Sequence, residues 1–89
     1  MISRDFKISN RLGLHARPSA QLTQVASRFH SDVYISRDGR RVNAKSIMGV
    51  MMLAAGPGAT VSVEASGPDE ESAVAAIGTL IESRFGESG

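Results

Sequence analysis

The sequence contains no cysteine and no tryptophan, and it has only one tyrosine among its 89 residues. Without cysteine, disulfide scaffolds, thiolate metal sites and thiol chemistry are excluded. No apolar run approaches the roughly 20 residues that a membrane-spanning helix needs. The first residues, Met1 to Lys7, also lack the apolar core of a signal peptide. We therefore expect a cytoplasmic protein that does not insert into a membrane.

The chain is short enough for one domain and has no room for a second core. This size argues against a large enzyme with a deep, enclosed pocket. Apolar residues make up 42% of the chain and charged residues 21%, which is ordinary for a globular domain. We expect a single domain over residues 1–89, with residues 86–89 as a frayed tail.

Charge is spread unevenly along the sequence, although the net charge is only +1. Residues 1–45 carry nine Lys or Arg and three Asp or Glu, whereas residues 46–89 carry one Arg and six Asp or Glu. The small net charge gives little support for nucleic-acid binding. Either the fold intermixes the two halves, or a basic patch steers acidic partners towards the protein.

Alternation of apolar and polar residues predicts the strands of a sheet. Asp38-Gly39 lies between two such runs and predicts a two-residue hairpin turn, because both central positions of that turn need positive φ. The expected strands cover residues 2–8, 32–37, 40–43 and 60–66.

Helical spacing predicts three helices. One covers residues 16–28, with Pro18 in its first turn, and a short one covers residues 47–53, with Ser46 as its N-cap. Pro68 to Glu71 opens the last helix, and its acidic side chains suit the positive end of the helix dipole. The buried stripe of this helix is expected to contain Val74, Ile77, Ile81 and Phe85. The element order predicts an α+β sandwich with the helices on one face of an antiparallel sheet.

Signals for most kinds of catalytic or cofactor site are missing. The sequence has no glycine-rich nucleotide loop of the P-loop type. The two histidines, His15 and His30, are expected at opposite ends of the first helix, too far apart to share a metal ion. Glu70 and Glu71 are better explained by the helix dipole than as paired catalytic carboxylates. We expect neither a metal nor a cofactor.

His15 stands at the expected start of the first helix, within the segment Gly13–Ala20. The first N–H groups of a helix have no intrahelical acceptor, and together with the dipole they form an anion site. Arg17 adds a fixed positive charge, so His15, Ala16 and Arg17 form a candidate phosphate site. Imidazole keeps a neutral, nucleophilic nitrogen at neutral pH. The plainer alternative is an N-cap or surface histidine without chemistry.

The segment Gly13–Ala20 resembles the phosphorylation motif of HPr, the histidine-containing phosphocarrier family of the bacterial phosphoenolpyruvate-dependent sugar phosphotransferase system. Asn43–Met51 resembles the family's second signature, around a regulatory serine, and Ser66–Glu70 resembles its entry to the last helix. The resemblance extends over about residues 2–86.

This resemblance implies a phosphoryl carrier. His15 would accept a phosphoryl group on Nδ1 from Enzyme I, which takes it from phosphoenolpyruvate, and would pass it to an EIIA-type domain. Arg17 would assist the transfer. The family fold is an open-faced sandwich of four antiparallel strands and three helices. Such a carrier has no turnover of its own, which leaves open whether it counts as an enzyme.

In the same family, Ser46 can be phosphorylated by an ATP-dependent HPr kinase. A phosphate there would add nearly two negative charges at the start of the short helix. The helix would tolerate them, whereas an acidic partner on the same face would not. The alternative is that Ser46 only caps its helix.

A partner-binding face is expected on the first two helices, on a protein that we expect to be monomeric. The resemblance places Ile47 and Met48 in the patch that meets Enzyme I and EIIA, while Val50 and Leu53 are the better core candidates. For any single methionine, core and interface remain open. The residues expected at the interface are Ala20, Gln21, Gln24, Ile47, Met48, Met51 and Met52.

The sequence departs from the family pattern at a few positions. Many members carry a small polar residue and a glycine where this chain has Met52 and Ala54, and Ser19 replaces a common alanine. These differences concern partner preference more than the chemistry. Three alternatives stay open: a binding module regulated through Ser46, the nitrogen-related branch of the same system, and an inert scaffold or excised domain.

Overall fold

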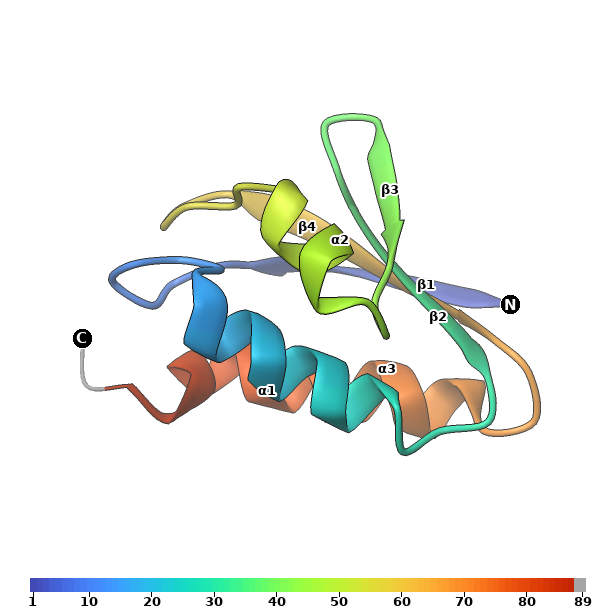
Figure 1. Cartoon of the computed structure of the whole chain (residues 1–89). Coiled ribbons are helices and arrows are strands. Elements are labelled where there is room, and N and C mark those ends of the chain that lie inside the picture. Colours follow the sequence, from blue (N-terminus) through green and yellow to red (C-terminus); the bar gives the residue numbers. More distant parts are fainter. Residues whose placement is uncertain (88–89) are drawn as a thin grey trace.

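A computed structural model describes residues 1–87 of the chain. Its elements follow the predicted order, with a short 3₁₀-helix, η1, added at the end (Figure 1). The elements are β1 (Ile2–Lys7), α1 (Ala16–Ala26), β2 (Asp32–Arg37), β3 (Arg40–Asn43), α2 (Ile47–Met52), β4 (Thr60–Ser66), α3 (Glu70–Glu82) and η1 (Arg84–Gly86).

The four strands form one antiparallel sheet in the order β1-β4-β2-β3. Alternate side chains of β2 and β4 are buried, and the paired residues Ile35 and Val63 belong to this apolar face. Their neighbours in sequence, among them Tyr34 and Glu64, are partly exposed on the other face. The sheet is therefore covered on one side only, as the predicted α+β sandwich requires.

All three helices lie on the apolar side of the sheet (Figure 1). Helix α3 packs on β1 and β4, and α1 packs against α2 and α3. Val74, Ile77 and Ile81 of α3 are fully buried, which confirms that part of the predicted stripe. Gly78 brings α3 close to the sheet, since a Cβ at this position would lie 2.5 Å from the ring of Phe6.

The β2–β3 hairpin has the predicted turn and also holds α2 in place. Asp38 and Gly39 both have positive φ, 51° and 81°. Arg37 donates a hydrogen bond to the carbonyl of Leu53 over 3.1 Å, and Arg40 donates one to the carbonyl of Met52 over 2.9 Å. These two bonds satisfy carbonyls at the end of α2, and Arg40 itself stays exposed.

Several predicted boundaries need correction, including the ends of β1 at Lys7 and of α2 at Met52, each one residue earlier than predicted. Helix α1 ends at Ala26 with Ser27 as its C-cap, two residues before the predicted end at residue 28. Phe85 is buried as predicted, but it lies in η1 with a φ of 55°, outside the regular helix. Of the tail predicted to fray, Gly86 closes η1 and the side chain of Glu87 makes hydrogen bonds. Residues 88 and 89 lie outside the described part of the chain.

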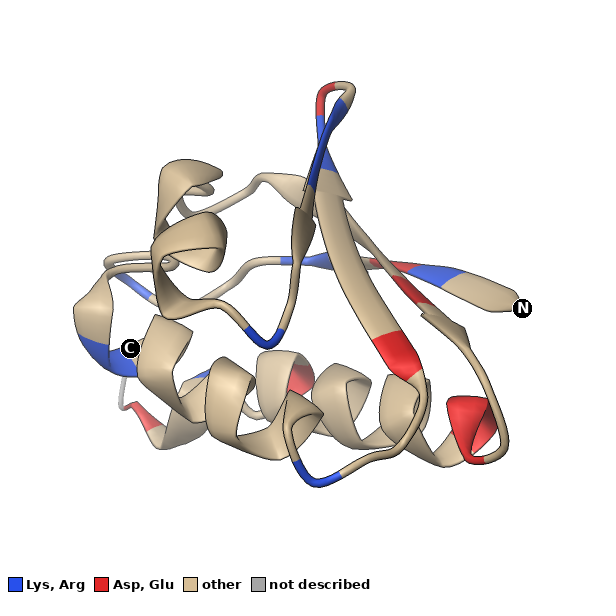
Figure 2. Ribbon diagram, turned by 45° about the vertical axis from the view of Figure 1, so that its right-hand side comes forward, with Lys and Arg blue, Asp and Glu red and all other residues tan. Residues whose placement is uncertain are grey.

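The fold separates some charges and mixes others. Basic residues gather on the β2–β3 hairpin, and acidic residues at the start of α3 (Figure 2). Across the sheet, Arg41 pairs with Glu64 over 3.5 Å, so residues from the basic and acidic halves of the sequence meet. The start of α1 lies at the opposite end of the molecule from the acidic start of α3 (Figure 1).

Candidate functional site

The loop before α1 is held against the segment that follows α2. Gly13 has a φ of +66°, and a Cβ on it would lie 2.3 Å from the carbonyl oxygen of Ala55. The next residue, Leu14, donates its N–H to this oxygen over 2.8 Å. The absence of a side chain on Gly13 thus admits the backbone of Ala55 and Gly56.

His15 occupies the N-cap position of α1, but its ring does not cap the helix. Its backbone is extended, with φ −81° and ψ −172°, and its side chain makes no capping hydrogen bond. The first intrahelical bond runs from the N–H of Ser19 to the carbonyl of His15, over 3.0 Å. The ring is 36% exposed, so it is available to a partner. His15 is thus the N-cap residue by position, as the plainer alternative has it, but its imidazole is not used for capping.

Two backbone N–H groups at the start of α1 are left for an anion. Within residues 1–87, no hydrogen bond engages the N–H of Ala16 or Arg17, and Pro18 has no N–H to offer. The side chain of Arg17 is exposed in the same turn, and no acidic group of the described chain pairs with it. The predicted group of His15, Ala16 and Arg17 is thus brought together at one helix end, where charge and orphan donors favour an anion.

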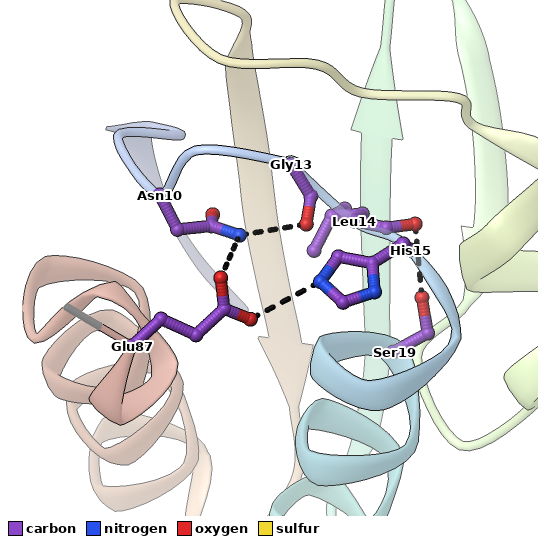
Figure 3. Close-up of polar contacts among 6 residues, drawn as sticks. All are labelled: Asn10, Gly13, Leu14, His15, Ser19 and Glu87. Atoms are coloured by element: carbon purple, nitrogen blue, oxygen red, sulfur yellow. Dashed lines mark hydrogen bonds and ion pairs between the residues drawn. The ribbon is translucent and has the colours of Figure 1, made fainter. Parts of the chain in front are cut away.

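Ser19 supports this end of the helix. Its side chain is fully buried, and its hydroxyl donates to the carbonyl of Leu14 over 3.2 Å. In the sequence, Ser19 stands out only as a replacement for a common alanine. The structure gives it a bond that ties the first turn of α1 to the loop that carries His15 (Figure 3).

Glu87 and Asn10 complete the surroundings of the ring, and sequence reasoning missed both. Oε2 of Glu87 lies 3.1 Å from Nε2 of His15 (Figure 3). Nδ2 of the buried Asn10 donates to Oε1 of Glu87 over 3.3 Å and to the carbonyl of Gly13 over 2.8 Å. The only sequence signal near Glu87 was the apolar Phe85 that anchors the segment.

Ser46 is the N-cap of α2, as predicted. Its hydroxyl oxygen accepts the N–H of Gly49 over 3.2 Å, and the residue is exposed. The capping role is therefore confirmed, and the same oxygen remains accessible from solvent. A phosphate on it would lie at the end of the helix where negative charge is tolerated.

The residues expected at a partner interface divide into two groups. Val50 and Leu53 of the short-helix region are buried, which confirms them as core residues. Gln21 and Ala20 on α1 are half-buried, and Oε1 of Gln21 is enclosed without a partner in the described chain. The exposed members are Gln24, Ile47, Met48, Met51 and Met52.

The described residues contain no group of three or more His, Cys, Asp or Glu side chains that could hold a metal ion. None of the helices described is long and apolar enough to span a membrane. The groups with shifted pKa values lie far from His15, at the start of α3. The hydroxyl of Ser31 and the N–H of His30 lower the pKa of Asp69 to about 2, and the N–H of Gly67 lowers the pKa of Glu70.

Comparison with known proteins decides the family. The model of the family described as "PTS HPr component phosphorylation site" matches residues 2–83. The chain belongs to the HPr family. It is 62% identical over 87 residues to the phosphocarrier protein HPr of Cupriavidus necator, covering 98% of each chain.

Solved structures agree with the HPr fold. The crystal structure of the protein named HPr-C-His from Thermoanaerobacter tengcongensis matches with a TM-score of 0.96 and 47% identity, covering all of both chains. An HPr dimer from the same organism matches with a TM-score of 0.79 and 48% identity, over 98% of this chain and 100% of that one. The open-faced sandwich of this family is thus the fold of this chain, and its activity is that of a phosphocarrier in the phosphotransferase system.

Proposed function

We propose that His15 accepts a phosphoryl group on Nδ1 from Enzyme I and passes it to an EIIA-type domain. One observation carries this assignment. Nε2 of His15 faces the Glu87 carboxylate at 3.1 Å, whereas Nδ1 has no hydrogen-bond partner in residues 1–87. Nδ1 is therefore the ring nitrogen whose lone pair is free to attack phosphorus.

The start of α1 would hold the transferred group without enclosing it. The free N–H groups of Ala16 and Arg17 would donate to the phosphoryl oxygens, and the Arg17 guanidinium would offset their charge. Because the ring and Arg17 are open to solvent, donor and acceptor proteins can each reach the same nitrogen. A carrier needs this shallow site, since a tightly held group could not be passed on.

The partner face is proposed on the exposed side chains of α1 and α2, next to His15. Helices α1 and α2 are in contact, and the loop of His15 is bonded to Ala55 just after α2. Met48 is 70% exposed, and methionine side chains adapt to differently shaped partners. We propose that the carrier acts as a monomer; the dimeric HPr among the similar structures makes the mass in solution the measurement that checks it.

The carrier function is tested by incubating the protein with Enzyme I, Mg²⁺ and phosphoenolpyruvate and measuring its intact mass. One added phosphoryl group that is lost after mild acid, and that is absent from His15→Ala, is the expected result. Parallel reactions with the Enzyme I of the sugar branch and of the nitrogen-related branch assign the pathway by rate. No phosphoryl transfer from either donor would overturn the proposal.

The role of Arg17 is tested separately. Arg17→Ala should slow phosphoryl transfer while leaving the melting temperature nearly unchanged, because the side chain is exposed and unpaired in the described chain. Arg28→Ala is the matched control, since Arg28 is also exposed but lies beyond the other end of α1. Equal rates for the two variants would exclude Arg17 from the site.

We propose in addition that phosphorylation of Ser46 weakens partner binding. The exposed Ser46 hydroxyl begins the helix that carries Met48 and Met51, so a phosphate would bring charge to the edge of the proposed face. Ser46→Asp should slow phosphoryl transfer from Enzyme I. Ser72→Asp, an exposed serine in the first turn of α3, places the same charge at a helix start away from His15 and should not.

A further inference from the structure

We infer that Glu87 is a positioning residue, which fixes the tautomer and the orientation of the His15 ring. This inference rests on the proposed function, because it states how the receiving nitrogen is selected. A carboxylate only accepts hydrogen bonds at neutral pH, so the ring atom that faces it must carry a proton. The 3.1 Å contact therefore makes Nε2 the protonated nitrogen and leaves the lone pair on Nδ1.

The carboxylate is itself held in place. Asn10 is fully buried and donates to Oε1 of Glu87, while Oε2 faces His15, so each oxygen has its own partner (Figure 3). The same amide of Asn10 also bonds the carbonyl of Gly13, two residues before His15. The backbone of Arg84 and Phe85, with φ values of 57° and 55°, leads the segment back from α3 towards this site. Buried Phe85 anchors the segment.

The same contact suits the charge that transfer creates. The Nδ1 lone pair attacks phosphorus, the bond from phosphorus to the donor atom breaks, and the donor keeps that electron pair. The proton on Nε2 stays where it is, so the ring becomes a cation whose N–H still faces the Glu87 carboxylate. A charge-assisted hydrogen bond is stronger than a neutral one, and Glu87 therefore favours the phosphorylated ring over the free one.

The full-length variants Glu87→Ala and Glu87→Gln test the inference, with Glu82→Ala as the matched control. Glu82 is exposed at the end of α3, and its side chain makes no hydrogen bond or ion pair in the described chain. The first readout is ¹⁵N NMR of the imidazole, recorded at a pH where the ring is neutral, which reports the tautomer without any partner protein. The second is the rate of phosphoryl transfer from Enzyme I.

We expect one tautomer, protonated at Nε2, in the unmodified protein and in Glu82→Ala. Glu87→Ala should show a mixture of tautomers and transfer roughly tenfold more slowly, a loss at the lower end of that caused by removing a carboxylate that orients a metal-ligating histidine. Glu87→Gln should keep the tautomer through its carbonyl oxygen but recover only part of the rate, since the charge is gone.

An unchanged tautomer and an unchanged rate in Glu87→Ala, with His15 still phosphorylated, would overturn the inference and leave the carrier function standing. A protein that receives no phosphoryl group would instead refute the carrier function. In that case the NMR comparison still decides whether Glu87 sets the tautomer of His15.

Discussion

Replacement of Gly13 by alanine tests how the loop of His15 is built. At a φ of +66°, a Cβ costs about 1–2 kcal/mol of free energy of unfolding. The same Cβ would lie 2.3 Å from the carbonyl oxygen of Ala55 and 2.7 Å from Cα of Gly56. Both are backbone atoms, so the two segments must separate, at a further cost of about 1–3 kcal/mol. We expect a total loss of roughly 2–5 kcal/mol.

Gly58→Ala provides a control that separates strain from overlap. Gly58 also has positive φ, +89°, but a Cβ there would meet no atom within 4 Å. Gly58→Ala should therefore lose only the free energy of unfolding that comes from placing a Cβ at positive φ, about 1–2 kcal/mol. For a domain of this size each kcal/mol lowers the melting temperature by about 4–8 °C, so thermal unfolding followed by circular dichroism resolves the two variants.

Gly13→Ala should change phosphoryl transfer at His15 as well as stability. Separation of Gly13 from Ala55 lengthens the hydrogen bond between Leu14 and Ala55, which is 2.8 Å here, and this moves His15 relative to the first turn of α1. Gly13→Ala should thus slow phosphoryl transfer at a temperature where it is still folded, and Gly58→Ala should not. Equal melting temperatures for the two variants would refute the claim that the loop is held by this close backbone approach.

Other predictions concern the core, the residue Ala54 just after α2, and the loss of stability at low pH. Ile77→Ala should lower the free energy of unfolding, measured by chemical denaturation, by about 2–5 kcal/mol, because the Ile77 side chain is fully buried between α3 and the sheet. A loss below about 0.5 kcal/mol would contradict this packing. Ala54→Gly should raise the melting temperature by a few degrees, because Ala54 has a φ of 49° and glycine relieves that strain. A melting temperature below that of the unmodified protein would contradict this. The pKa of Asp69 is lowered from 3.8 to about 2, so its charge stabilises the fold above about pH 4, and this contribution is lost as the pH falls towards 2. Asp69→Asn should therefore show a smaller drop in melting temperature between pH 4 and pH 2 than the unmodified protein, and an equal drop would refute it.

Features that depend on nearby residues could be predicted from the sequence. The alternation in β4, the Asp38-Gly39 turn and the Ser46 cap are each set by a few adjacent side chains, and all three are present in the structure. The same holds for the start of α1. There, the missing N–H of Pro18 and the position of His15 follow from helix geometry alone.

Features that depend on contacts between distant segments could not be predicted in this way. The contact between Arg40 and α2 is one example, because nothing in the hairpin sequence says that α2 ends beside it. Its bond to the carbonyl of Met52 exists only once the sheet has placed β3 against α2. The end of α1 was misplaced for a different reason: the helical spacing of apolar residues continues to Phe29, whereas after Ser27 the N–H groups of Arg28 and Phe29 bond carbonyls only three residues back.

Glu87 shows why the candidate site was only half visible in the sequence. The nucleophile and its anion-binding amides are encoded within a few residues, so a local pattern reveals them. The carboxylate that faces His15 comes from 72 residues further along the chain. Its arrival depends on two successive non-glycine residues with positive φ, Arg84 and Phe85, which local propensity disfavours. The burial of Phe85 against the core compensates for this conformation. Phe85, which the sequence pattern places in the last helix, is thus the residue whose burial brings the Glu87 carboxylate to the His15 ring.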